Sequence, residues 1–125
     1  MALPVLICDD SSFARKQMKR ALPADWDVDV TFAGNGLEGL DAIRAGKGEV
    51  VFLDLTMPEL DGYGVLEQIR KEDLPAMVIV VSGDIQPDAQ DRVHKLGAMA
   101  FIKKPIDQAK AAEVLTQFGI LSEAE

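Results

Sequence analysis

Five short runs of apolar residues recur along the chain, and each is apolar at nearly every position instead of at every second one. Their content of Val, Ile, Leu and Phe favours β-strands. A strand that is apolar on both sides needs both faces of its sheet covered, as in parallel sheets flanked by helices. We therefore predict strands at residues 4–8, 28–33, 50–55, 77–81 and 100–102.

The segments between these runs carry apolar residues at helical spacing, with charged residues on the opposite side. The predicted apolar faces are Ala14, Met18, Ala21 and Leu22; Leu37, Leu40 and Ile43; Gly62, Val65, Leu66 and Ile69; Ala89, Val93 and Leu96; and Ala111, Val114, Leu115 and Phe118. Strands that alternate with helices in this way predict a doubly wound α/β fold.

Size and composition limit the possible functions. The chain has 125 residues, and we predict a single domain over residues 1–125. Its 13 Lys and Arg against 21 Asp and Glu give a net charge of -8, so we expect no direct nucleic-acid binding. The longest apolar run, residues 76–81, is far shorter than the roughly 20 residues that cross a bilayer, so we expect no membrane span. A single cysteine and the absence of a secretion signal favour the cytoplasm.

Polar and charged residues follow four of the predicted strands. Ligands of doubly wound folds bind beyond the carboxyl ends of the strands, where the strand order reverses. The residues at these ends are Asp9 and Asp10, Asp54, Ser82, and Lys103 and Lys104. This edge of the sheet is therefore the predicted functional site.

Three carboxylates at one edge of a sheet repel one another unless a cation neutralises them. Mg²⁺ accepts a few hard oxygen ligands, keeps several waters and commonly bridges to phosphate. We predict Asp10 and Asp54 as direct ligands, with Asp9 acting through water. Three carboxylates, one divalent cation and one lysine sum to about zero charge, which suits an incoming phosphoryl group.

Four segments at successive strand ends resemble the receiver domain of two-component response regulators, of the chemotaxis-regulator type. The segments are VLICDDS, VVFLDLTMPELDG, VIVVSG and GAMAFIKKP. The resemblance covers almost the whole chain. It implies a flavodoxin-like fold whose five parallel strands have the order 2-1-3-4-5, flanked by five helices.

The resemblance also implies roles for individual residues. Asp54 matches the aspartate that accepts a phosphoryl group and forms an acyl phosphate. Metal ligands are matched by Asp9, Asp10, Asp54 and the backbone carbonyl of Thr56, which would hold Mg²⁺ or Mn²⁺. Lys104 matches the lysine that contacts the phosphoryl oxygens, and Ser82 and Phe101 match the residues that switch conformation. The Lys104–Pro105 peptide bond is expected to be cis.

The resemblance implies a signalling domain that modifies itself, not an enzyme that turns over other molecules. Its expected donor is a sensor histidine kinase or a histidine phosphotransfer protein. The output remains open between a separate partner protein and an effector domain fused in a longer chain. Thr56 and Asp84, two residues beyond Asp54 and Ser82, are expected to set the lifetime of the acyl phosphate.

Simpler interpretations exist for several residues. Asp10, Ser11 or Ser12 could only cap a helix. The basic stripe, defined as Arg15, Lys16, Lys19 and Arg20, is interpreted as a solvated helix face, with docking of the phosphodonor as the alternative. Cys8 is interpreted as a small buried apolar residue and His94 receives no role.

Two other functions are compatible with an aspartate at the end of a central strand. Haloacid-dehalogenase-type phosphatases also use an aspartyl phosphate, but they carry a second Asp two residues later, where this chain has Thr56. The other rival is a receiver-like scaffold that binds partners without taking phosphate. The presence of the acidic pair, the acceptor, the hydroxyl residue and the lysine argues against it.

Overall fold

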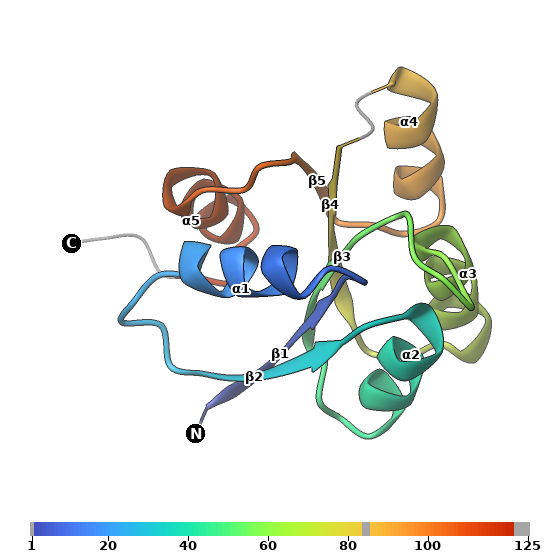
Figure 1. Cartoon of the computed structure of the whole chain (residues 1–125), viewed down its shortest axis with the longest axis horizontal. Coiled ribbons are helices and arrows are strands. Elements are labelled where there is room, and N and C mark those ends of the chain that lie inside the picture. Colours follow the sequence, from blue (N-terminus) through green and yellow to red (C-terminus); the bar gives the residue numbers. More distant parts are fainter. Residues whose placement is uncertain (1, 84–85, 122–125) are drawn as a thin grey trace.

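The computed structural model describes residues 2–83 and 86–121, and its centre is one parallel sheet with the strand order β2-β1-β3-β4-β5 (Figure 1). The strands are β1 (Leu3–Cys8), β2 (Val28–Ala33), β3 (Val50–Leu53), β4 (Met77–Ser82) and β5 (Ala100–Lys103). The predicted fold class and strand order are confirmed. The strand bounds differ from the predicted ones by up to two residues, because β3 ends before Asp54.

Helices cover both faces of this sheet (Figure 1). They are α1 (Ser12–Ala21), α2 (Gly36–Arg44), α3 (Gly62–Glu72), α4 (Pro87–Lys95) and α5 (Gln108–Gln117). Helices α1 and α5 lie on one face, and α2, α3 and α4 lie on the other. None of the helices in the described part of the chain is long and apolar enough to cross a bilayer.

The two helical layers explain why the strands are apolar at successive positions. On β1, Val5 and Ile7 pack with Met18 and Leu115 on the α1 and α5 side. The residue between them, Leu6, packs into the opposite core. All of these side chains are almost completely buried, and each contributes about 1.5–3 kcal/mol by leaving water.

Side-chain caps begin four of the helices close behind the strands. The caps are Ser11, Asn35, Asp61 and Asp107, each of which accepts a backbone N–H from the first turn of its helix. The caps therefore fix the residue at which each of these helices begins.

Two predicted core positions are wrong. Leu37 is 51% exposed and Phe118 is 39% exposed. Leu37 lies in the first turn of α2 and Phe118 is the C-cap of α5, so both lie at helix ends.

Candidate functional site

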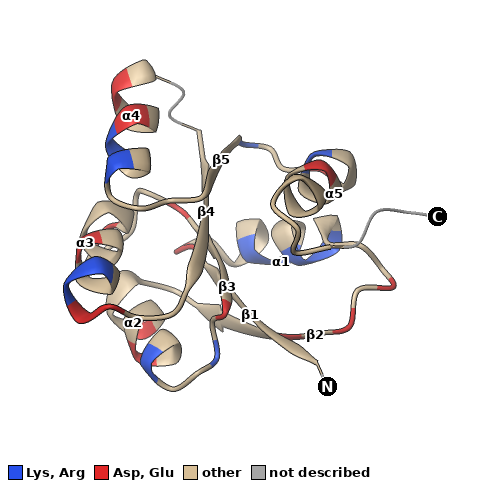
Figure 2. Ribbon diagram, turned by 180° about the vertical axis from the view of Figure 1, so that it is seen from behind, with Lys and Arg blue, Asp and Glu red and all other residues tan. Residues whose placement is uncertain are grey.

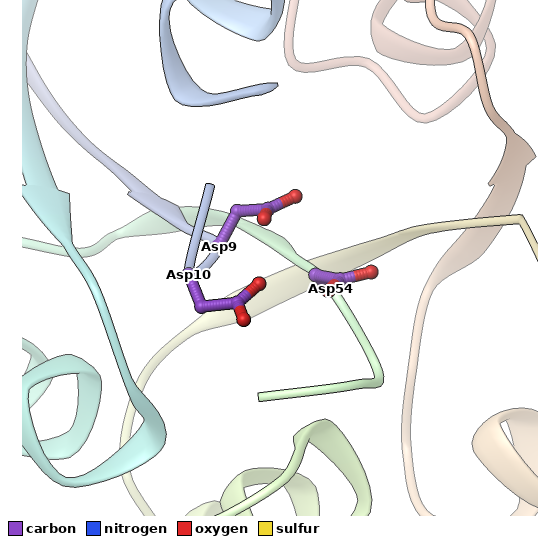
Figure 3. Close-up of side chains that lie close together, drawn as sticks. All are labelled: Asp9, Asp10 and Asp54. Atoms are coloured by element: carbon purple, nitrogen blue, oxygen red, sulfur yellow. The ribbon is translucent and has the colours of Figure 1, made fainter. Parts of the chain in front are cut away.

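Two adjacent strands bring the three acidic residues together. Asp9 and Asp10 follow β1 and Asp54 follows β3, and the backbone N–H of Asp54 donates to the carbonyl of Cys8 over 2.9 Å. One carboxylate oxygen from each acidic residue lies within 4.8 Å of the others, and the three side chains face a common space (Figure 3). The predicted acidic cluster is therefore present at the carboxyl edge of the sheet.

Lys104 reaches this cluster from the loop after β5. Its Nζ lies 2.7 Å from Oδ2 of Asp9 and 3.2 Å from Oδ1 of Asp54. Its backbone N–H donates to the carbonyl of Ser82 over 2.9 Å, which fixes the loop against β4. The Lys104–Pro105 peptide bond is cis, as expected. Lys103, the neighbouring lysine, is exposed.

Burial and charge shift the acid–base behaviour of the site. Burial raises the pKa of the Asp54 carboxyl, the charge of Asp9 raises it further, and Lys104 opposes the rise without cancelling it. Burial alone lowers the pKa of the Lys104 ammonium, but the hydrogen bond to Asp9 and the charges of Asp54 and Asp9 bring it above its ordinary value. The site is therefore short of positive charge even with its lysine in place.

The two members of the acidic pair have different surroundings. Asp9 is 1% exposed, and its Oδ1 accepts the backbone N–H of Ser11 over 2.9 Å. Asp10 is exposed, and Ser11 caps α1 in its place. Asp9 is therefore already held by the protein, whereas Asp10 is open to an incoming ligand.

The donor set fits a small divalent cation. Octahedral Mg²⁺ with oxygen ligands at about 2.0–2.1 Å places neighbouring ligands about 3 Å apart and opposite ones about 4 Å apart. The carboxylate oxygens of Asp9, Asp10 and Asp54, all within 4.8 Å of one another, need only small shifts to reach these separations. Their negative charge exceeds that of Lys104, so the cluster favours an added cation.

The remaining predicted site residues lie at the end of β4, on β5 and in the loop after β3. Ser82 ends β4 and is 3% exposed, whereas Thr56 lies exposed in the loop after β3. Phe101 on β5 is half-buried and lines a hollow of about 250 Å³ between β5 and α4. Asp84 lies outside the described residues.

Gly62 has a role at the site that the sequence pattern did not reveal. A Cβ on Gly62 would lie 2.5 Å from the backbone oxygen of Asp54 and 2.8 Å from Cα of Leu55. The missing side chain therefore lets α3 begin directly against the loop that carries Asp54. The Gly following Asp61 in the motif was a possible signal for this close approach.

The basic stripe does not have one uniform environment. Lys and Arg residues lie along α1 (Figure 2), and Lys16, Lys19 and Arg20 are exposed, as predicted. Arg15 is half-buried, so its assignment to the solvated face is wrong. Its Nη1 donates to the backbone carbonyl of Asp9 over 2.7 Å, which draws the side chain inward.

Cys8 is a buried apolar residue, as predicted from the sequence. Cys8 is completely buried, and its burial, with further contributions from Asp9 and Asp54, raises the pKa of the thiol to about 12. The thiol is therefore neutral at ordinary pH. His94 is exposed on α4.

Comparisons with known proteins agree with this geometry. Residues 5–116 match the response regulator receiver domain. The chain is 39% identical over 114 residues to the chemotaxis protein CheY of Listeria monocytogenes, covering 90% of this chain and 95% of that protein. It is 31% identical over 117 residues to CheY of Bacillus subtilis, covering 94% and 98%.

A solved structure extends the comparison to the fold. The chain superposes on a Borrelia burgdorferi structure described as a CheX–CheY–BeF3–Mg complex with a TM-score of 0.83 and 30% identity, covering 94% of this chain and 89% of that one. These matches exclude the phosphatase alternative, since they identify a phosphoacceptor module and not an enzyme that turns over small phosphates. The chain belongs to the family of response regulator receiver domains, which act in phosphorylation-based, two-component signalling.

Proposed function

We propose that Asp54 accepts a phosphoryl group from a phosphohistidine, in a reaction that needs Mg²⁺ or Mn²⁺ held by Asp9, Asp10, Asp54 and the backbone carbonyl of Thr56. The observation that carries this proposal is the position of Lys104, whose Nζ contacts both Asp9 and Asp54. An ammonium beside the central carboxylate can move onto phosphoryl oxygens when they arrive.

The transfer breaks one bond and forms another. An oxygen of the Asp54 carboxylate attacks phosphorus, the P–N bond breaks, and its electron pair returns to the donor imidazole. Such a loose transition state requires in-line geometry and positive charge on the equatorial oxygens. A cation held by the acidic cluster would supply part of that charge, and Lys104 supplies the rest. The hydrogen bond from the backbone N–H of Asp54 to the carbonyl of Cys8 holds the Asp54 backbone in position for the attack.

The conformational response passes through Ser82 and Phe101. Ser82 is buried at the end of β4, which pairs with β3, the strand that Asp54 follows. Its hydroxyl moves toward the new phosphoryl oxygens, and the Phe101 ring turns into the space that is vacated. Because Phe101 lines the hollow beside α4, its rotation alters the α4 and β5 surface.

The partners of this domain follow from the same chemistry. We infer that the donor is a sensor histidine kinase or a histidine phosphotransfer protein in the cytoplasm. Residues 1–125 act as one receiver domain, and its output is a separate protein or a fused effector. Both arrangements occur among relatives, since the chain matches CheY proteins over most of their length but covers 28% of a methylesterase from Symbiobacterium thermophilum.

Phosphorylation of the purified chain tests this proposal. Incubation with acetyl phosphate and Mg²⁺ is expected to add the mass of one phosphoryl group, and EDTA is expected to prevent the addition. The Asp54→Asn variant should gain no mass, whereas Asp29→Asn, which removes an exposed carboxylate on β2, should behave as wild type. A gain that persists in Asp54→Asn would place the acceptor elsewhere.

A further inference from the structure

Arg15 is the residue of the basic stripe that turns toward the site. Its Nη1 donates to the backbone carbonyl of Asp9 over 2.7 Å, and its side chain is half-buried. The other three members of the stripe are exposed. Arg15 therefore has a specific partner within the loop that carries the acidic pair.

The carbonyl that Arg15 binds belongs to the peptide group between Asp9 and Asp10. The Asp9 side chain is fixed independently, by the backbone N–H of Ser11 at 2.9 Å and by Lys104 at 2.7 Å. Within residues 2–83 and 86–121, the Asp10 carboxylate makes no hydrogen bond or ion pair. The direction of the Asp10 side chain is therefore set by its backbone, and the hydrogen bond from Arg15 restrains the peptide plane that precedes it.

The guanidinium is itself held in place. It lies 6.0 Å from the centroid of the Phe32 ring, within range of a cation–π contact. Gly34 lies beside it, since a Cβ on that residue would be 3.6 Å from Nη1 of Arg15. The Phe32 ring on β2 thus helps to hold the guanidinium where it donates to the Asp9 carbonyl.

We propose that Arg15 is a positioning residue that aims the Asp10 carboxylate at the divalent cation. This inference rests on the cation site of the proposed function. The expected change in cation affinity on removal of Arg15 is opposite to the change that charge repulsion predicts, because Arg15 carries a positive charge near a cation site. If charge alone mattered, removing Arg15 would strengthen cation binding; if Arg15 positions Asp10, its removal weakens binding.

Binding of Mn²⁺ to the folded protein separates these roles. The electron paramagnetic resonance signal of free Mn²⁺ gives the dissociation constant, and competition gives that of Mg²⁺. We expect Arg15→Ala to raise the dissociation constant roughly 10-fold, the usual lower range for losing a residue that orients a metal ligand. Unfolding of the metal-free variants, measured in parallel, reports any separate effect on stability.

Lys19→Ala is the matched control. Lys19 lies on the same helix, carries the same charge and lies 5.9 Å from the centroid of the same Phe32 ring. In the described part of the chain, its side chain makes no hydrogen bond or ion pair with Asp9. Its removal should leave the dissociation constant unchanged or slightly lower. A tenfold rise in both variants would assign the effect to the shared contact with the Phe32 ring and overturn the proposal.

The outcomes distinguish this inference from the proposed function. An unchanged or lower dissociation constant in folded Arg15→Ala overturns the positioning role and leaves the cation site intact. If circular dichroism shows that Arg15→Ala does not fold, Arg15→Gln is measured instead. The same rise in the Mn²⁺ dissociation constant is expected, and an unchanged or lower value again overturns the positioning role. Absence of Mn²⁺ binding by the wild-type chain would instead remove the proposed cation site.

Discussion

Replacing Asp54 by Asn should stabilise the metal-free protein. The carboxylate lies among Asp9, Asp10 and Lys104, and it is 6% exposed. Burial is the main cause of its raised pKa, followed by the charge of Asp9. In the absence of a cation, the ionised Asp54 is therefore unfavourable to the folded state, and a neutral amide of similar shape relieves that cost.

The magnitude follows from the distances. With an effective dielectric constant of about 20, Lys104 at 3.2 Å attracts Asp54 by about 5 kcal/mol. At 4.8 Å, the upper limit for the separations in the cluster, Asp9 repels it by about 3.5 kcal/mol, and by more at any shorter distance; exposed Asp10 adds a smaller, screened repulsion. The charges nearly cancel, so burial decides the sign. Taking a carboxylate out of water costs a few kcal/mol, which exceeds the residual attraction of about 1 kcal/mol. We therefore expect a gain of about 1–2 kcal/mol, which corresponds to about 4–10 °C in Tm.

Chemical denaturation in EDTA across a range of pH measures this gain. A carboxyl whose pKa is raised in the folded state lowers stability as pH rises. The free energy of unfolding of Asp54→Asn should therefore equal that of wild type well below the ordinary pKa of 3.8. The difference should increase as pH rises and reach its full value above the pKa of Asp54 in the folded state. Mg²⁺ should reduce it by stabilising the wild type. Asp29→Asn controls for net charge, and a variant less stable than wild type at neutral pH would refute the reasoning.

Three further predictions concern the surroundings of the site and the surface. Lys104→Ala should lower the metal-free unfolding free energy by about 2–4 kcal/mol, because it leaves buried carboxylates unpaired, and added Mg²⁺ should restore part of the loss in denaturation experiments. Gly62→Ala should cost about 1–3 kcal/mol and weaken Mn²⁺ binding, because its Cβ would press on the backbone of Asp54. The hydrogen bond from Arg44 lowers the pKa of Glu72 to about 2 from 4.5, so the stability difference between wild type and Glu72→Gln should be complete above pH 4.5 and shrink as pH falls toward 2.

Much of the fold was predictable because burial on both faces leaves a clear trace in the sequence. The run at residues 50–53 is buried at every position, and the sequence is apolar at every position there. The helix ends were less predictable, since Leu37 has the spacing of a core residue but lies in the first turn of α2, where it is exposed. Periodicity gives the direction of a side chain but not how far the neighbouring layer extends.

The acidic cluster was predictable for a topological reason. The carboxyl ends of parallel strands meet at one edge, so Asp9, Asp10 and Asp54 could be placed together without coordinates. The inward turn of Arg15 could not, because helical spacing put it with Lys16 and Lys19. Its partner is a backbone carbonyl, which carries no signal in the sequence. The close approach of Gly62 to Asp54 likewise depends on how α3 packs.

Locating the modified residue tests the central claim most directly. Borohydride reduction of the protein treated with acetyl phosphate and Mg²⁺ converts an aspartyl phosphate to homoserine, which peptide mass spectrometry assigns to a position. Homoserine is predicted at residue 54, and it should be missing when EDTA is present during the incubation with acetyl phosphate. Homoserine at Asp9 or Asp10, or a phosphorylated chain with none at residue 54, would contradict the account.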